Sequence, residues 1–184
     1  MFQDTRTFRS TLAMAALAAV LAAGGTVRAE EETISGFSAW EGRGTVYDTG
    51  TNSGTFVGAI SGTLFIETEN GPAAAGHMVC PALLEIDLQS ATQVGAGKCT
   101  ITGDDGAKVF AEWTCQGVHL VGCDGEIKLT GGTGRMIGIT GGGSLSVRTI
   151  TQIAAMTATA TGSVAETGKG ILMLDDLKYS LPQQ

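Results

Sequence analysis

The chain has 184 residues, 18 of them acidic against 11 lysines and arginines, and a formal net charge of −7. Binding to nucleic-acid backbones needs clustered Lys and Arg, whereas the basic residues after position 29 lie far apart in the sequence. The composition therefore argues against a nucleic-acid partner, and the length suits one domain with a single core.

Residues 1–29 have the pattern of an export signal. Arg6 and Arg9 supply a positive start, and the stretch 11–25 is uncharged and rich in Ala and Leu. Small or tolerated residues precede a cleavage site after Ala29. The apolar stretch is shorter than the ~20 residues that a membrane-spanning helix needs. We expect signal cleavage, a secreted or periplasmic protein, and one mature domain over residues 30–184.

The mature chain alternates between apolar and polar residues, and it has no sustained apolar period of 3.6 residues. The clearest strand is 84–89, in which Leu84, Ile86 and Leu88 share one face. The other predicted strands are 33–40, 55–67, 98–102, 108–115, 126–130, 144–150, 154–164 and 171–179.

Turn signals separate these strands. Gly103-Asp104-Asp105-Gly106 predicts a hairpin between its flanking strands. Further breaks are predicted at residues 70–72, 124–125 and 166–168, and a surface loop is predicted at 73–77. Many short strands with turns between them favour an antiparallel barrel or sandwich.

The stretch 130–143 is half glycine, which indicates a backbone turn, bulge or close approach. We interpret it as a structural turn built on five glycines. Its spacing differs from G-x-G-x-x-G, and no Lys-Ser or Lys-Thr pair follows it, so a phosphate-binding loop is disfavoured. The five positions are Gly131, Gly132, Gly134, Gly138 and Gly141.

In this all-β context, residues 131–141 resemble the glycine-rich signature of allene oxide cyclase and dirigent-type barrels, G-G-T-G-x-[aromatic or apolar]-x-G-x-x-G. The Asp-rich hairpin and the strand 108–113 resemble the strand pair that comes before that signature. The match is limited to about residues 98–148 and looks like the exported bacterial, allene-oxide-cyclase-like branch. It implies a single antiparallel barrel of eight strands with a central apolar cavity, and it implies homo-oligomers.

An even number of cysteines in an exported chain predicts disulfides. If Asp105 and Gly106 centre the hairpin, Cys99 lies opposite Glu112, so a bridge from Cys99 to Cys115 is disfavoured by distance. We expect one bridge between Cys115 and Cys123, and another between Cys80 and Cys99.

A metal site is the alternative use of these cysteines. His77 precedes Cys80 by three residues, and Cys115, His119 and Cys123 follow one another at intervals of four. Residues four apart on one strand are ~13 Å apart, too far for one coordination sphere. We therefore expect no metal and no cofactor, and we interpret both histidines as structural or solvated.

The candidate binding residues lie on two predicted strands. If the face of Phe110, Glu112 and Thr114 lines the barrel, the Glu112 carboxyl enters an apolar cavity and its pKa rises. If the face of Trp113 points inward, Glu112 is an ordinary exposed acid. Arg148 is the matching candidate for the anionic end of a ligand, with the same two alternatives. Glu112 and Arg148 are also the candidate catalytic residues.

The sequence has neither a G-x-S-x-G nor an H-E-x-x-H motif. We therefore expect a barrel that binds a small apolar or amphipathic molecule without catalysis. The alternatives are a cofactor-free cyclase or isomerase of the allene oxide cyclase type, and a structural or adhesive envelope protein. Glu85, Asp87, Glu126 and Lys128 on outward faces argue against a barrel embedded in a membrane.

Overall fold

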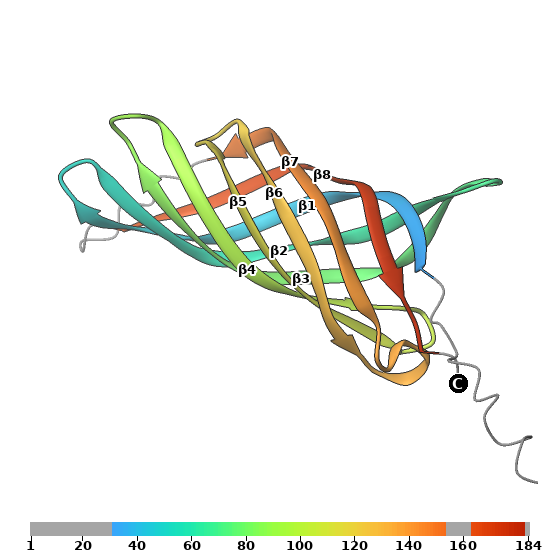
Figure 1. The fold of residues 1–184 in the computed structure, drawn as a ribbon. Coiled ribbons are helices and arrows are strands. Elements are labelled where there is room, and N and C mark those ends of the chain that lie inside the picture. Colours follow the sequence, from blue (N-terminus) through green and yellow to red (C-terminus); the bar gives the residue numbers. More distant parts are fainter. Residues whose placement is uncertain (1–30, 154–162, 183–184) are drawn as a thin grey trace, which may run out of the picture.

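The computed structural model, which describes residues 31–153 and 163–182, is a closed barrel of eight antiparallel strands (Figure 1). Each strand pairs with the next, and β8 returns to pair with β1. The fold predicted from the sequence is therefore confirmed. The strands are β1 (Glu31–Gly50), β2 (Ser53–Thr68), β3 (Gly71–Asp87), β4 (Thr92–Thr102), β5 (Lys108–Val118), β6 (Gly122–Gly132), β7 (Thr140–Ile153) and β8 (Ser163–Ser180).

Two sequence predictions fall on residues that the structure does not describe. The export signal, residues 1–29, lies outside the described part of the chain. So does most of the predicted strand 154–164, of which the last two residues begin β8. No helix among the described residues is long and apolar enough to cross a membrane.

Several predicted breaks are wrong because the strands run through them. Residues 73–77 belong to β3, residues 124–125 to β6 and residues 166–168 to β8. In each case the Gly or Asp that suggested a turn is paired with a residue of the neighbouring strand. Conversely, β3 ends at Asp87, so Leu88 lies in the following turn and is 57% exposed instead of facing inward.

The hairpin between β4 and β5 forms as predicted, with a register one residue away from the expected one. Cys99 lies opposite Ala111, and Thr102 opposite Lys108, because the loop 103–107 has an odd number of residues. The Asp105 carboxylate accepts a hydrogen bond from the backbone N–H of Ala107 at 3.0 Å and closes the turn.

The glycine-rich stretch joins β6 to β7 through a short 3-10 turn, η1 (Gly134–Met136). Gly134 and Gly138 have φ of 60° and 79°, a conformation that side chains with a Cβ rarely adopt. Gly132 is packed between the carbonyl oxygens of Lys108 and Met136, each less than 3 Å from where a Cβ would lie. The stretch is therefore a tight connection at one end of the barrel.

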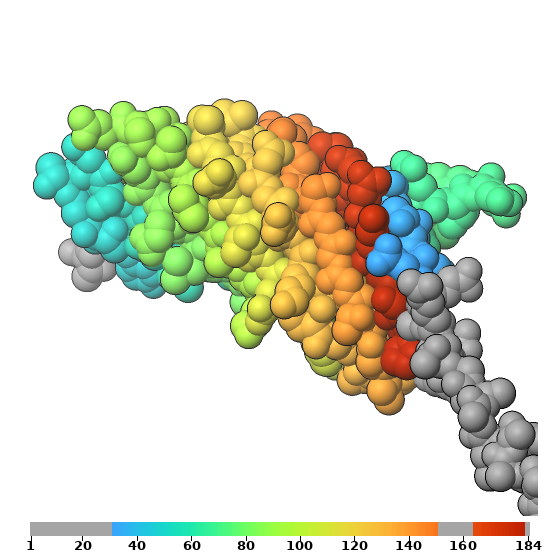
Figure 2. Space-filling view, in the orientation of Figure 1, coloured from blue at the N-terminus to red at the C-terminus, as the bar shows by residue number. Residues whose placement is uncertain are grey.

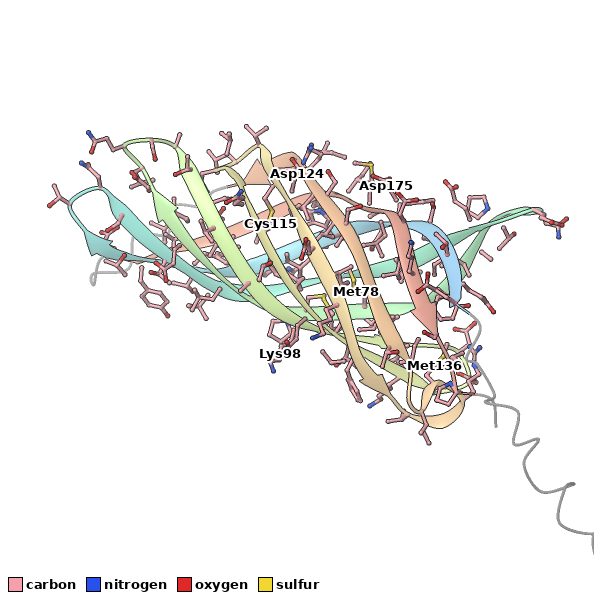
Figure 3. The ribbon with its side chains drawn as sticks, in the orientation of Figure 1. Met78, Lys98, Cys115, Asp124, Met136 and Asp175 are labelled. Atoms are coloured by element: carbon pink, nitrogen blue, oxygen red, sulfur yellow. A yellow bond between two sulfur atoms is a disulfide. The ribbon has the colours of Figure 1, made fainter. Side chains whose placement is uncertain are left out.

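The two ends of the barrel differ. At the closed end, Glu31 pairs with Ser180, and the β2–β3, β4–β5 and β6–β7 connections lie around them (Figure 1). Inward side chains fill the barrel interior there, and Figure 3 shows Met136 at this end. The open end carries the β1–β2, β3–β4 and β5–β6 connections. The buried side chains of the filled part are Leu64, Met78, Ile101, Ala111, Leu129, Ile139, Leu174 and Leu177.

The outer wall is continuous across the strands in view, with the β2–β3 hairpin projecting at the closed end (Figure 2). Polar side chains on this wall pair across neighbouring strands. Lys98 on β4 contacts Glu112 on β5 at 2.8 Å, and Arg135 after β6 contacts Asp105 at 2.6 Å. All four side chains are well exposed, so each ion pair contributes little to stability.

Candidate ligand cavity

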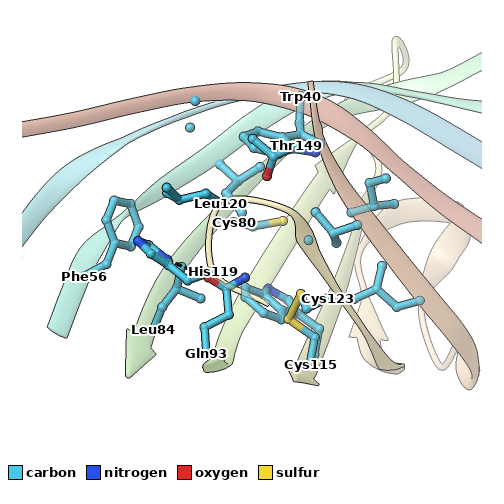
Figure 4. A pocket seen from close by; sticks show the side chains of 18 of the residues that line it. Trp40, Phe56, Cys80, Leu84, Gln93, Cys115, His119, Leu120, Cys123 and Thr149 are labelled. Atoms are coloured by element: carbon cyan, nitrogen blue, oxygen red, sulfur yellow. Dashed lines mark hydrogen bonds between the residues drawn. A yellow bond between two sulfur atoms is a disulfide. The ribbon is translucent and has the colours of Figure 1, made fainter. Parts of the chain in front are cut away.

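A cavity of about 100 Å³ occupies the half of the barrel towards the open end. About 10–15 Å³ is enough for one water molecule, so this space suits a small organic molecule. Most of the lining is apolar, and it comes from all eight strands and the β5–β6 connection (Figure 4). Its largest side chains are Trp40, Phe56, Leu84, Trp113, Ile127 and Leu145.

Inward glycines make room for the aromatic rings. A Cβ on Gly58 would come within 2.4 Å of the Phe56 ring, and a Cβ on Gly97 within 2.7 Å of the Trp113 indole nitrogen. A Cβ on Gly170 would come within 2.7 Å of the Trp40 indole. Each ring therefore lies over a neighbouring position without a side chain. This alternation of large and small inward residues shapes the wall of the cavity.

Two disulfides form part of the same wall. One bridge joins Cys80 on β3 to Cys99 on β4, and the other joins Cys115 on β5 to Cys123 on β6. These are the two pairings that we expected. Because each of the four sulfurs is part of a disulfide, none is available as the thiolate that a zinc site needs. No cluster of metal-ligating side chains occurs in the described ranges.

The β5–β6 connection crosses the open end beside the cavity, and hydrogen bonds hold it on both sides. The backbone N–H of His119 donates to the Ala91 carbonyl at 2.9 Å, and the N–H of Thr149 donates to the Val121 carbonyl at 3.0 Å. The His119 ring also lies 3.1 Å from the Gln93 amide oxygen (Figure 4). Burial lowers the pKa of His119, so its ring is neutral at neutral pH.

Glu166 brings a carboxyl group to the cavity from β8. Its side chain shares a strand face with Leu172, which is buried in the barrel. Within the described part of the chain, no hydrogen bond or ion pair holds this carboxyl. Burial raises its pKa, because removal from water disfavours the charged form.

A second polar group of the cavity wall lacks a partner. The indole N–H of Trp40 is buried, and no hydrogen-bond acceptor in the described residues contacts it. A buried donor left in this state costs roughly 1–3 kcal/mol. Two residues of the cavity wall, Trp40 and Glu166, thus each carry a polar group that no other described residue engages.

Of the two alternatives for β5, the one in which Phe110, Glu112 and Thr114 line the barrel is wrong. The opposite face of β5 points inward, with Trp113 only 7% exposed and Cys115 fixed in its disulfide. Glu112 lies on the outer wall against Lys98, and this ion pair lowers the pKa of its carboxyl instead of raising it. The exposed-acid alternative is the one that the structure supports.

Arg148 also lies outside, so the alternative that makes it a cavity residue is wrong as well. Its guanidinium donates to the Asp124 carboxylate at 2.9 and 3.1 Å, and it donates to the Cys123 carbonyl at 3.2 Å. Its neighbour Val147 faces the cavity instead. Asp124, on the outer wall in Figure 3, also accepts a hydrogen bond from Ser146 at 2.5 Å. His77, expected in a loop, is exposed on β3.

Exposed apolar side chains surround the open end. They lie on the connections there and on the outward faces of the adjoining strand ends, and one of them, Leu120, also lines the cavity. An apolar molecule approaching this end meets a surface of its own polarity. The side chains are Tyr47, Leu88, Val94, Val118, Leu120, Val121 and Ile150.

Trp40, His119 and Glu166 line the cavity, and none of the three is a binding residue that the sequence predicts. The residues after Glu166, Thr167 and Gly168, favour a turn in the sequence and obscure its position on a strand. A signal is present, however, because Glu166, Gly168, Gly170 and Leu172 alternate along one face, as inward residues of a barrel strand do.

No protein-family model and no curated protein matches the sequence. Among solved structures, the barrel is similar to a pterocarpan synthase dirigent protein, with a TM-score of 0.43 and 11% sequence identity. The match covers 85% of this chain and 90% of that protein. At this level of similarity it carries no information about a ligand or a reaction.

Proposed function

We propose that this barrel binds a small, mainly apolar molecule in the cavity at its open end. The observation that supports the proposal is the contrast between the two halves of the barrel. Side chains fill the interior at the closed end, whereas the open half keeps a cavity of about 100 Å³ beside three aromatic rings. A purely structural barrel gains stability from filling such a space, since lost packing contacts cost free energy.

Native mass spectrometry of the purified protein, recorded beside its denatured mass, tests this proposal. We expect an additional mass that is released on denaturation. Val147→Phe, which places a ring in the cavity, should abolish it, whereas Val79→Phe on the outer wall should not. Thermal unfolding of both variants checks that they are folded. Retention of the additional mass in a folded Val147→Phe protein would contradict the proposal.

The proposal includes export to an oxidising compartment, supported by the signal-like residues 1–29 and by the two disulfides. We also propose that the protein belongs to the exported, allene-oxide-cyclase-like branch and that it forms homo-oligomers. Both points are supported by the glycine-rich stretch alone. Mass determination of the protein from the exported fraction tests the proposed export, with an N-terminus at Glu30 as the expected result.

A cofactor-free cyclase or isomerase is the second candidate function. The two candidate catalytic residues, Glu112 and Arg148, lie on the outer wall and cannot reach a ligand in the cavity. The support for this function therefore comes from Glu166, which lines the cavity. A carboxyl group with a raised pKa in an apolar cavity is suited to proton transfer. Conversion of a bound ligand that stops in Glu166→Gln and continues in Glu112→Gln would favour this candidate over simple binding.

A further inference from the structure

Resting on the proposed function, we propose that the ligand of the cavity is an organic cation: a small apolar body that carries an ammonium group, which the Glu166 carboxylate holds. The cavity wall offers one acidic side chain, and no lysine or arginine lines it within the described residues. A neutral ligand would leave this carboxyl without a charged partner, and an anionic ligand would be repelled by it.

The other charged and titratable groups near the cavity do not offset the negative charge of Glu166. His119 lines it in the neutral form. Lys169 lies on the outer face of β8, where its ammonium group is directed to Glu41 at 3.9 Å. Arg148, on the outer face of β7, is held by Asp124. The stretch 154–162 of the sequence contains no charged residue.

Two aromatic rings lie over the β1 positions opposite and next to Glu166. Glu166 pairs with Gly44 on β1, and a Cβ on Gly44 would lie 2.4 Å from the Phe56 ring, so that ring covers the position beside Glu166. Gly42 is the inward residue of β1 that precedes Gly44, and a Cβ on it would lie 3.3 Å from the Trp40 ring. Faces of Trp and Phe attract cations through the ring quadrupole. A carboxylate beside two such rings is suited to an ammonium group with an apolar substituent.

Three probes of similar size and different charge test the inference: benzylamine, which is protonated at neutral pH, benzyl alcohol and benzoate. The chain's two tryptophans, Trp40 and Trp113, both line the cavity, so intrinsic fluorescence reports its occupancy. We expect benzylamine to bind about tenfold or more tightly than benzyl alcohol, as a charge-assisted hydrogen bond implies. Benzoate should bind more weakly than either.

Two substitutions at Glu166 and one control at Glu112 locate the effect. Glu166→Gln should remove the preference for benzylamine over benzyl alcohol, and Glu166→Asp should retain part of it. Glu112→Gln, which removes a glutamate from the outer wall, should leave the preference as it is. If benzyl alcohol binds as tightly as benzylamine, or if Glu166→Gln keeps the preference, the inference is wrong while the binding function stands. If none of the three probes binds, the inference is wrong, and the additional mass in native mass spectrometry still decides the binding function.

Discussion

The Trp40 indole occupies the space that a side chain on Gly170 would need. The two residues pair across the β1–β8 ladder, and a Cβ on Gly170 would lie 2.7 Å from the indole and 2.0 Å from the Arg148 carbonyl oxygen. One side of the cavity is thus shaped by a glycine on one strand and a ring on the next.

Gly170→Ala should therefore destabilise the barrel, by about 1–3 kcal/mol or more, because a backbone atom as well as a ring must move. Gly42→Ala is the matched control, since its Cβ would meet only side chains, the nearest being the Trp40 ring at 3.3 Å. Denaturant unfolding followed by tryptophan fluorescence measures both. Equal losses of stability in the two variants would contradict the packing described here.

Glu166→Gln should stabilise the protein at neutral pH. Burial raises the pKa of Glu166 in the folded state, so the folded protein binds a proton more readily than the unfolded chain does. Stability from this group is present at low pH and is lost as the pH rises through the folded-state pKa. We expect a melting temperature roughly 1–3 °C above wild type at pH 7.5, with the difference vanishing near pH 4.

Glu112→Gln should show the opposite pH dependence. Lys98 lowers the pKa of Glu112, so the stability from this pair is present above the unfolded-state pKa and is lost as the pH falls through the folded-state pKa. The variant should be slightly less stable than wild type at pH 7.5, and equal to it in strong acid. Thermal melts of both glutamine variants from acid to pH 7.5 measure the change in melting temperature relative to wild type. A change of the same sign at pH 7.5 in both variants would refute the assignment of Glu166 to the inner face and Glu112 to the outer face.

Removal of the two disulfides should have unequal effects. The Cys80–Cys99 bridge spans 19 residues and the Cys115–Cys123 bridge spans 8. The chain-entropy relation assigns about 3 kcal/mol to the longer loop and about 2.5 kcal/mol to the shorter one. Paired Cys→Ala variants, measured by denaturant unfolding, should lose stability in that order. The reverse order would show that packing around the sulfurs outweighs loop entropy.

Arg148→Ala should leave ligand binding within about twofold of wild type, because the guanidinium lies on the outer wall with Asp124. The same fluorescence titration with benzylamine measures this. A tenfold loss of affinity would place Arg148 at the ligand after all.

The architecture is accessible from sequence because alternation, turn residues and cysteine number are local signals. The orientation of β5 is not, since Phe110 and Trp113 lie on opposite faces and either face is apolar enough to turn inward. The hairpin register differs by one residue because the loop 103–107 has an odd number of residues, which no composition rule determines.

The position of the cavity is not a local property of the sequence. It depends on which inward glycines come to lie beside which rings, such as Gly44 beside Phe56, and that depends on register across the whole barrel. Glu166 becomes a site residue only because the β1–β8 ladder places it opposite Gly44.

The pairing of Glu31 with Ser180 has a practical consequence for handling the protein. Because the first and last strands meet at the closed end, a linker joined through either of these residues departs from the side opposite the cavity mouth. A sensor chip or resin attached in that way would hold every molecule with its entrance facing the flowing solution.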